Sequence, residues 1–222
     1  MNSKRKNSFL YNNSLSIIFL LLAVITIVAQ VLTGLHQYND FLNEQHKTPV
    51  SILQYFKSGH FIEATFENWE SEFLQMALFV WLTVFLRQKG SSESKPISGK
   101  KEVERQPKIH PDTPWPVRKG GIILSVYKHS LSLSLLLLFI ASFLLHLYGS
   151  NKDFNEQQIL KGKSTETMIT YLSNSRLWFE SFQNWQSEFL SVFAIIFLSI
   201  YLREIGSPQS KPVDAPHSET GE

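Results

Sequence analysis

Four apolar runs, separated by polar segments, set the pattern of this 222-residue chain. The first and third carry no charged residue over 7–39 and 129–151, and each exceeds the ~20 residues that a membrane-spanning helix needs. The second and fourth, 73–86 and 189–202, are also free of charge but shorter. The pattern therefore predicts an all-α membrane protein with four transmembrane helices, although the mean hydropathy of the whole chain is −0.08.

Each apolar run predicts a helix, and polar segments connect them. We expect spans near 14–35 and 130–148, and longer helices near 60–88 and 176–204. In the longer helices, aromatic and aliphatic residues recur at helical spacing in a stripe that enters the apolar run: Ile62, Phe66, Trp69 and Phe73, then Trp178, Phe182, Trp185 and Phe189. A short extracytoplasmic interfacial helix is expected before each longer helix, starting at Thr48-Pro49 in the first case and at Ser164 in the second.

The two shorter runs of 14 residues reach about 21 Å as helices, less than the ~30 Å of a hydrocarbon core. The turns just upstream must therefore lie at the membrane boundary, or the bilayer must thin. Aromatic side chains favour such boundaries. We expect Trp69, Phe73, Trp185 and Phe189 there, with Arg87 and Arg203 closing the opposite ends.

The chain also repeats itself. NWESEFL at 68–74 returns as NWQSEFL at 184–190, and residues 68–96 align without a gap to residues 184–212. The match predicts two copies of one unit of about 90 residues, each a helical hairpin. It also argues against a cleaved leader at the N-terminus, because the first span has an internal counterpart at 130–148.

Lysine and arginine suggest the orientation. Three lie at the N-terminus, ten over 87–128 and two from Arg203 onward, against six in the two intervening loops. The positive-inside rule predicts a multi-pass protein with both termini cytoplasmic and two parallel repeats. The predicted organisation is a first repeat at 1–90, a flexible basic cytoplasmic linker at 91–121, a second repeat at 122–206 and a disordered cytoplasmic tail at 207–222.

Polar residues within the helices mark the best candidate site. On a helical wheel they form a polar seam beside the aromatic stripe, at similar depths in all four spans. Its members are Asn68, Glu72, Gln75, Asn184, Glu188, Ser191, Gln30 and His146.

Two interpretations of this seam remain open. Glu72 and Glu188, assisted by His146, could bind a cation or relay protons, which indicates a small transporter or an ion or proton conduit. Alternatively, the seam holds the helices together through hydrogen bonds, in a structural, stress-related or partner-binding membrane protein. The sequence by itself favours packing.

The sequence offers little support for disulfide, metal or catalytic sites. The chain has no cysteine, which excludes disulfides and thiolate sites, and its other histidines are scattered without metal-ligand spacing. We expect no enzyme activity, no catalytic residues, no metal and no cofactor. The expected partners are the lipid bilayer and either a second copy of the chain or another membrane protein, not nucleic acid.

The segments GSSESKP (90–96) and GSPQSKP (206–212) are interpreted as helix ends followed by a solvated basic tail. Together with NWESEFL and NWQSEFL they resemble a family of uncharacterised bacterial integral membrane proteins, a domain of unknown function with the pattern NWxSEFL…LRxxGSxxSKP. The resemblance covers most of the chain. The second copy departs from the first at Gln186, Ser191 and Glu204, which replace Glu70, Gln75 and Gln88. The resemblance implies a bacterial inner-membrane location and no particular activity.

Overall fold

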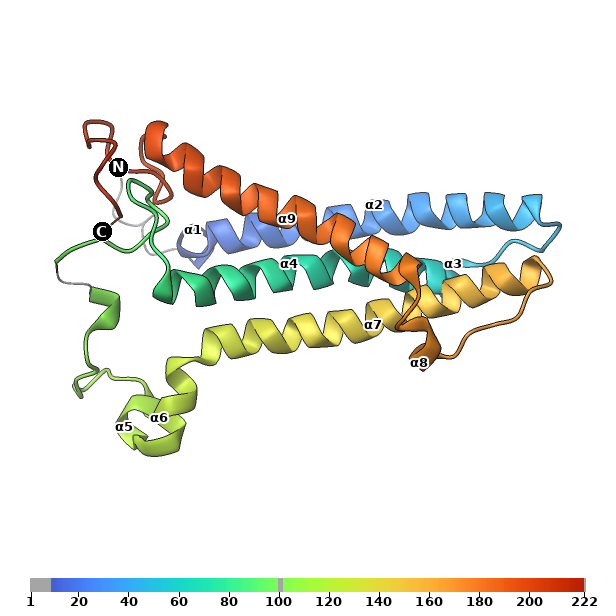
Figure 1. Cartoon of the computed structure of the whole chain (residues 1–222), viewed down its shortest axis with the longest axis horizontal. Helices are drawn as coiled ribbons and strands as arrows, with labels where there is room; N and C mark the ends of the chain where they lie inside the picture. The colour runs from blue at the N-terminus through green and yellow to red at the C-terminus, as the bar shows by residue number, and fades with distance from the viewer. Residues whose placement is uncertain (1–8, 100–101, 222) are drawn as a thin grey trace. The chain divides into compact units, whose positions relative to one another are not determined.

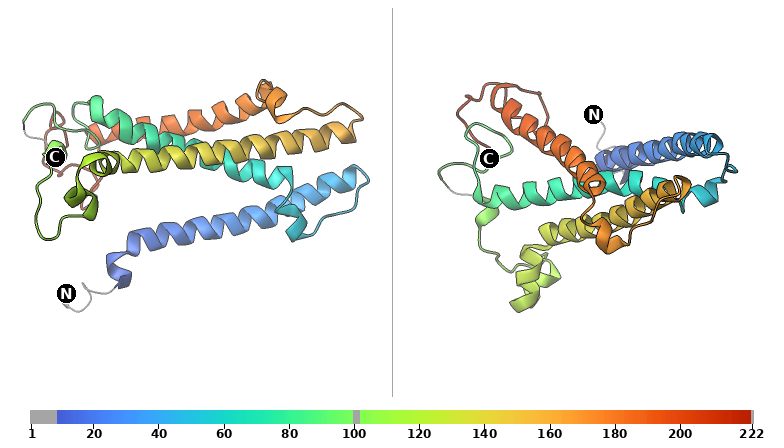
Figure 2. Two further views of the ribbon diagram at one scale, coloured as in Figure 1. Left: turned by 90° about the horizontal axis from the view of Figure 1, so that it is seen from below. Right: turned by 45° about the vertical axis from the view of Figure 1, so that its right-hand side comes forward.

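The computed structural model describes residues 9–99 and 102–221, and its regular elements over these ranges are helical, without a β-strand. Figure 1 shows their order and Figure 2 gives two further views. The predicted all-α class is confirmed. The helices are α1 Phe9–Asn12, α2 Ser14–Glu44, α3 Ile52–Tyr55, α4 Gly59–Phe85, the 3₁₀ helix η2 Glu102–Glu104, α5 Trp115–Lys119, α6 Gly121–Lys128, α7 Ser130–Leu160, α8 Met168–Tyr171 and α9 Ser175–Tyr201.

Six of the described helices form two series of matching length. The helices α2 and α7 each have 31 residues, α3 and α8 each have four, and α4 and α9 each have 27. The predicted spans begin where α2 and α7 begin, but the helices continue to Glu44 and Leu160. Their polar ends contain no proline to stop them, so the end of an apolar run is not the end of its helix.

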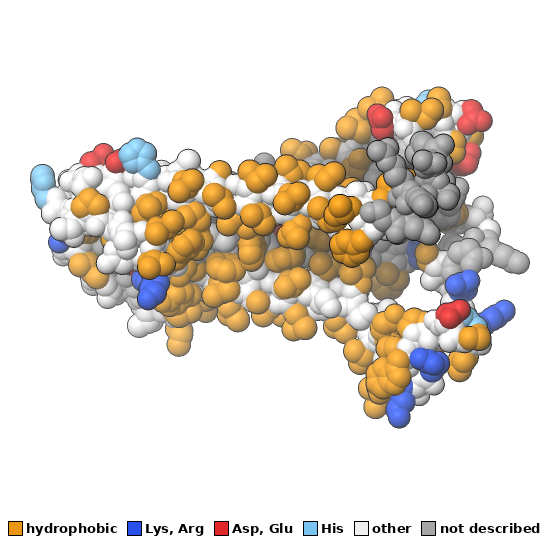
Figure 3. All heavy atoms as spheres, turned by 180° about the vertical axis from the view of Figure 1, so that it is seen from behind, with side chains coloured by type: hydrophobic (Ala, Val, Ile, Leu, Met, Phe, Trp, Pro, Cys, Tyr) orange, Lys and Arg blue, Asp and Glu red, His pale blue; other side chains and the backbone are white. Residues whose placement is uncertain are grey.

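Two of the described helices, α2 and α7, are long and apolar enough to cross a membrane. Little of the most apolar stretch of α2 is buried within the protein, and less than a quarter of that of α7. On the face drawn in Figure 3, hydrophobic side chains gather over the helices. Exposed apolar surface of this extent is unusual for a protein surrounded by water and suggests contact with lipid. The basic residues Lys4, Arg5, Lys6, Lys100 and Lys101, which contribute to the predicted orientation, lie outside the described residues.

The chain divides into two compact units. Unit 1 comprises residues up to Glu63 together with Tyr148–Thr167, and unit 2 comprises Ala64–Leu147 and Met168–Glu222. The helices α4 and α7 therefore contribute residues to both units.

Unit 1 is built around Tyr55, which is 1% exposed. Its ring packs against Tyr38 and Phe61, and its hydroxyl lies 3.0 Å from Nδ1 of His60. Glycine permits a close approach of α4 and α7 within this unit. A Cβ at Gly149 would collide with the backbone of α4 at Ile62 and Glu63.

Asparagine side chains hold the two loops of unit 1. Asn39 accepts a hydrogen bond from the backbone N–H of Val50 and donates one to its carbonyl, at 2.7 and 3.1 Å. Asn155 makes the same pair of bonds with Glu166, each at 2.8 Å. The two loops are thus held by equivalent contacts.

The helix α3, which was predicted as an interfacial helix, begins later than the sequence indicated. Ser51, and not Thr48, precedes its first turn, and the side chain of Gln54 accepts the backbone N–H of Ser51 at 2.8 Å. The prediction of an N-cap at Thr48-Pro49 is wrong, because the capping box of Ser51 and Gln54 provides hydrogen-bond partners for the start of the helix three residues further on.

In unit 2, the repeated C-terminal motif caps helices. Nζ of Lys95 donates to the carbonyl of Val84 in the last turn of α4, at 2.8 Å, and Oγ of Ser94 accepts the backbone N–H of Gln88. After α9, Oγ of Ser210 accepts the N–H of Glu204 in the same way. Cations at a helix C-terminus satisfy carbonyls that lack a helical partner.

The interpretation of the second motif as a solvated basic tail is wrong at Lys211, which is 6% exposed. Its Nζ donates to the backbone carbonyls of Pro216, His217 and Glu219. These contacts order the tail in unit 2, because a buried ammonium requires polar partners.

Candidate functional site

The helix α9 supplies three residues of the site from one face: Arg176, Glu180 and Asn184. The side chain of Asn174 caps this helix by accepting the backbone N–H of Arg176, which fixes the first turn. Glu180 follows one turn later and accepts a hydrogen bond from Nε of Arg176 at 2.7 Å. Asn184 follows after another turn. Residues four apart on a helix are neighbours, so all three reach the same region of unit 2.

The helix α4 supplies two carboxylates, Glu67 and Glu70, which lie one turn apart. Glu70 is 0% exposed. One of its oxygens accepts the indole N–H of Trp185 at 2.9 Å, and the other lies 2.7 Å from Nδ1 of His146. Both oxygens of this buried carboxylate therefore have a partner, as burial requires.

The helix α7 supplies His146, which is also 0% exposed. While Nδ1 faces Glu70, Nε2 lies 3.3 Å from the second carboxylate oxygen of Glu180. The imidazole therefore stands between two carboxylates that come from α4 and α9.

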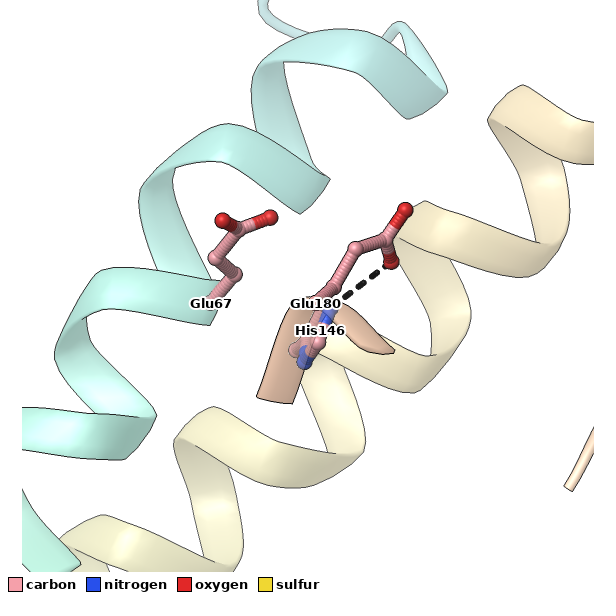
Figure 4. A group of neighbouring side chains, drawn as sticks. All are labelled: Glu67, His146 and Glu180. Atoms are coloured by element: carbon pink, nitrogen blue, oxygen red, sulfur yellow. Dashed lines mark hydrogen bonds and ion pairs between the residues drawn. The ribbon is translucent and has the colours of Figure 1, made fainter. Parts of the chain in front are cut away.

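Glu67 completes the site. Its Oε1 accepts a hydrogen bond from Asn184 at 2.6 Å. Glu67, His146 and Glu180 each offer one nitrogen or oxygen, and these three atoms lie within 4.8 Å of one another. Figure 4 shows Glu67 projecting from α4 toward the place where His146 and Glu180 meet. We call Glu67, Glu70, His146, Arg176 and Glu180 the His–Glu cluster.

The charges of the His–Glu cluster do not balance by themselves. With the three carboxyl groups ionised and the imidazole neutral, three negative charges face the single positive charge of Arg176. An unbalanced charge away from water is costly, so such a site takes up protons or a cation. The cluster is therefore suited to bind, exchange or relay a positive charge.

Aromatic rings pack beside the cluster. Trp178 contacts Phe143 and Phe182, with ring centroids 6.2 and 5.6 Å apart, and Trp185 contacts Phe139 at 6.5 Å. The rings join α7 to α9 in unit 2. Because Trp185 also donates to Glu70, this packing helps to fix the position of that carboxylate.

The polar seam predicted from the sequence does not coincide with the His–Glu cluster. The carboxyl groups of Glu72 and Glu188 lie close enough to interact. Glu72 is exposed, however, and Glu188 is only half-buried.

The other members of the seam are dispersed. Asn68 is exposed and donates to the carbonyl of Ala64 in its own helix. Ser191 is exposed and donates to the carbonyl of Glu188, and Gln75 lines a groove of unit 2. Gln30 belongs to unit 1, so its predicted place in the seam stays a prediction. Of the predicted seam, His146 belongs to the His–Glu cluster and Asn184 donates a hydrogen bond to it.

The four aromatic residues predicted at the membrane boundary also lie in different environments. Trp69 packs on Phe66 in α4, and Phe73 is half-buried. Phe189 lines the same groove as Gln75. Trp185 is the one of these four that donates to the His–Glu cluster.

Sequence reasoning missed Glu67, Glu70 and Glu180, and it expected no metal site because the histidines are scattered. Two signals were present. Arg176 and Glu180 have the spacing of a helical ion pair. In addition, Glu70, which bonds to His146, lies in NWESEFL at the position where NWQSEFL has Gln186. The two similar motifs therefore differ in charge at this position, which sets Glu70 apart.

The fold and the site define an all-helical protein with two helices suited to cross a membrane and a buried cluster of histidine and carboxylates. The chain belongs to the family described as Domain of unknown function (DUF6766), whose model matches residues 6–222. The predicted membership in a family of unknown function is confirmed. Neither a search of curated proteins nor a search of solved structures found a significant match.

Proposed function

We propose that this protein is an integral membrane protein that binds a cation at the His–Glu cluster and transports or conducts it. One observation carries the proposal: the fully buried His146 faces Glu70 with one ring nitrogen and Glu180 with the other. Ionisable groups within apolar helical segments are costly and commonly mark the paths of ions or protons.

The proposed architecture has four transmembrane helices. The apolar, poorly buried helices α2 and α7 support two of them. For α4 and α9, the support is a charge-free run followed by an arginine, Arg87 or Arg203, whose guanidinium caps the end of its helix. The short runs suit a bilayer that is locally thinned, or helices whose polar turns lie at the boundary.

We further propose that the chain consists of two parallel helical hairpins that arose by duplication. The repeated motif, the equal lengths of the paired helices and the equivalent contacts of Asn39 and Asn155 support this. The excess of lysine and arginine in both tails and the linker favours cytoplasmic termini in a bacterial inner membrane. Binding and passage of a cation, without a catalysed reaction, is the proposed activity. The proposed partners are lipid and either a second copy or another membrane protein.

The test is a flux assay on the purified full-length protein in liposomes. An internal pH dye reports proton entry and a metal-sensitive dye reports metal entry, each driven by an imposed gradient. We expect flux above that of empty liposomes, and a loss of at least about tenfold in His146→Gln and Glu180→Gln. His36→Gln and Glu44→Gln change the same groups at exposed positions and should leave flux unchanged.

A second candidate function is a non-transporting membrane protein in which the cluster holds helices together. The hydrogen bonds of Glu70 with Trp185 and of Glu67 with Asn184 favour it, because they join α4 to α9. It predicts no flux in the wild type, together with a lower unfolding temperature in Glu70→Gln. Flux that depends on His146 while helicity and unfolding temperature are retained would reject this alternative.

Water access separates the two functions independently. The native chain has no cysteine, so a single cysteine at Gln75 or Ser191 can be labelled without background. A water-filled path along the predicted seam requires that polar thiol reagents reach both positions in liposomes. Protection of both would count against such a path, while labelling at Glu44, an exposed position at the end of α2, would verify the reagent.

A further inference from the structure

We propose that Glu67, Nε2 of His146 and Glu180 form the three-residue site of one divalent transition-metal ion, with Zn²⁺ as the ion that fits best. The inference rests on the proposed cation binding and names the cation. The three ligands come from α4, α7 and α9, and all belong to unit 2.

The distances at His146 differ on the two sides of the ring. Nδ1 lies 2.7 Å from Glu70, which is the length of a charge-assisted hydrogen bond. Nε2 lies 3.3 Å from Glu180, longer than such a bond. Two ligands held at about 2.0–2.2 Å by one tetrahedral ion lie about 3.4 Å apart, so this longer distance suits shared coordination.

Glu70 is the positioning residue. By accepting a hydrogen bond from Nδ1–H of His146, it leaves the lone pair on Nε2 directed toward Glu180 and Glu67. Histidines that bind metal ions commonly donate their other N–H to a carboxylate in this way, which fixes the tautomer and increases the basicity of the ligand. The indole of Trp185 holds the remaining oxygen of Glu70, so the carboxylate has little freedom to turn.

The charge of a divalent ion also fits. The cluster has two more carboxylates than positive side chains when His146 is neutral, and the neutral imidazole is the form that binds metals. An ion of charge +2 would make the cluster electrically neutral. A monovalent ion would leave one negative charge without compensation.

The donor set selects among divalent ions. One imidazole nitrogen and two carboxylate oxygens suit Zn²⁺ better than Ca²⁺ or Mg²⁺, which prefer oxygen ligands in larger number. Three protein ligands leave a fourth tetrahedral position for water or for an incoming group. An open position allows an ion to be exchanged, as transport requires.

Glu67 is the ligand that can adjust to close the site, because its half-buried side chain has rotatable torsions and Asn184 holds one of its carboxylate oxygens. The three donor atoms lie at most 4.8 Å apart, so a rotation of this side chain brings them to ligand spacing without a movement of the helices.

The experiment measures Zn²⁺ binding to the full-length protein in detergent after removal of metal with a chelator. Elemental analysis gives the stoichiometry, and competition with a chromophoric chelator gives the affinity. We expect one Zn²⁺ per chain, with binding weakened by more than about 100-fold in Glu67→Gln and Glu180→Gln and by about 10–100-fold in Glu70→Gln. The exposed control Glu44→Gln should bind as the wild type does.

Co²⁺ supplies a readout that packing alone would not change. Bound at this site, it should give the intense visible absorption of tetrahedral cobalt, and the spectrum should shift in Glu70→Gln and vanish in Glu67→Gln. Far-UV circular dichroism of each variant verifies the fold. Glu67 is only half-buried, so its variant keeps the test valid if a change at His146 prevents folding.

The outcomes separate the two proposals. Zn²⁺ binding that depends on Glu67 and Glu180 without metal or proton flux would support the metal site and reject the transport function. Proton flux that depends on His146 without stoichiometric Zn²⁺ binding would overturn the metal site and leave the transport function standing. Equal Zn²⁺ affinity in the wild type and in Glu67→Gln and Glu180→Gln would also overturn it.

Discussion

The hydrogen bond between Trp185 and Glu70 offers a direct measure of how strongly the cluster holds α4 to α9. The indole N–H meets a carboxylate that is 0% exposed, at 2.9 Å. Trp185→Phe removes the donor, and Glu70→Gln removes the charge of the acceptor. The two single variants and the double variant form a thermodynamic cycle that isolates the interaction from the loss of ring packing.

The expected coupling energy follows from burial. Hydrogen bonds to charged groups contribute about 1.5–3 kcal/mol, whereas interhelical bonds in membrane proteins average about 0.6 and reach about 1.7 kcal/mol. Since water has no access to Glu70, we expect about 1.5 kcal/mol, near the overlap of the two ranges. This corresponds to slightly more than a tenfold change in the unfolding equilibrium. Glu70→Gln alone should cost more, about 2–3 kcal/mol, because the bond to His146 changes as well.

The assay is reversible unfolding of the four proteins in mixed micelles with increasing dodecyl sulfate, followed by far-UV circular dichroism. Fluorescence is less suitable because the chain has five tryptophans. A control cycle uses Trp69→Phe and Gln186→Ala, because Trp69 in NWESEFL corresponds to Trp185, and Gln186 in NWQSEFL corresponds to Glu70. Both side chains are exposed, so their coupling should be near zero.

A coupling energy below about 0.5 kcal/mol for Trp185 and Glu70 would refute the reasoning, since it would equal that of an exposed pair. A coupling energy of about 1.5 kcal/mol in the control cycle would also refute the reasoning, because burial would then not be the cause of the coupling.

Three further predictions concern other parts of the chain. Lys95→Met should lower the free energy of unfolding by about 1 kcal/mol, because it removes a cation from the C-terminal carbonyls of α4. Lys89→Met, at an exposed position, should leave it unchanged, and thermal unfolding of the two variants tests this. Gly149→Ala should cost about 1–3 kcal/mol in the same assay, because its methyl group would enter the α4 backbone, and an unchanged stability would contradict the close approach. Burial raises the pKa of Tyr55 to about 12 from its ordinary 10.0, so the fold favours the neutral phenol and stability should fall as the pH rises from 10 toward 12. In an ultraviolet titration, Tyr55→Phe should remove a tyrosine that ionises near pH 12. If the variant instead removes a tyrosine that ionises near pH 10, the burial of Tyr55 is contradicted.

Much of the fold could be predicted because its causes are local. Helical spacing of apolar residues placed the starts of α2 and α7 and located α4 and α9 to within a few residues. The ends were less accurate, since capping is decided by single contacts such as those of Ser51 and Lys95. The site was predicted only in part. A helical wheel gives the face of each helix, but not the rotation of one helix against the next, so His146 was found and its carboxylate partners were not.

The sequence by itself determined the helical class, the apolar runs, the repeated spacing and the family, because each depends on neighbours along the chain. Only the tertiary structure decided which charges meet. Glu70 and Glu180 lie far from His146 in the sequence, and they meet it because α4, α7 and α9 come together in unit 2. In the same structure the pair of Glu72 and Glu188 is more exposed, whereas Glu70 and His146 of the His–Glu cluster are buried. Since the energy of a charge depends on its burial and its partners, the position of the site was decided by packing.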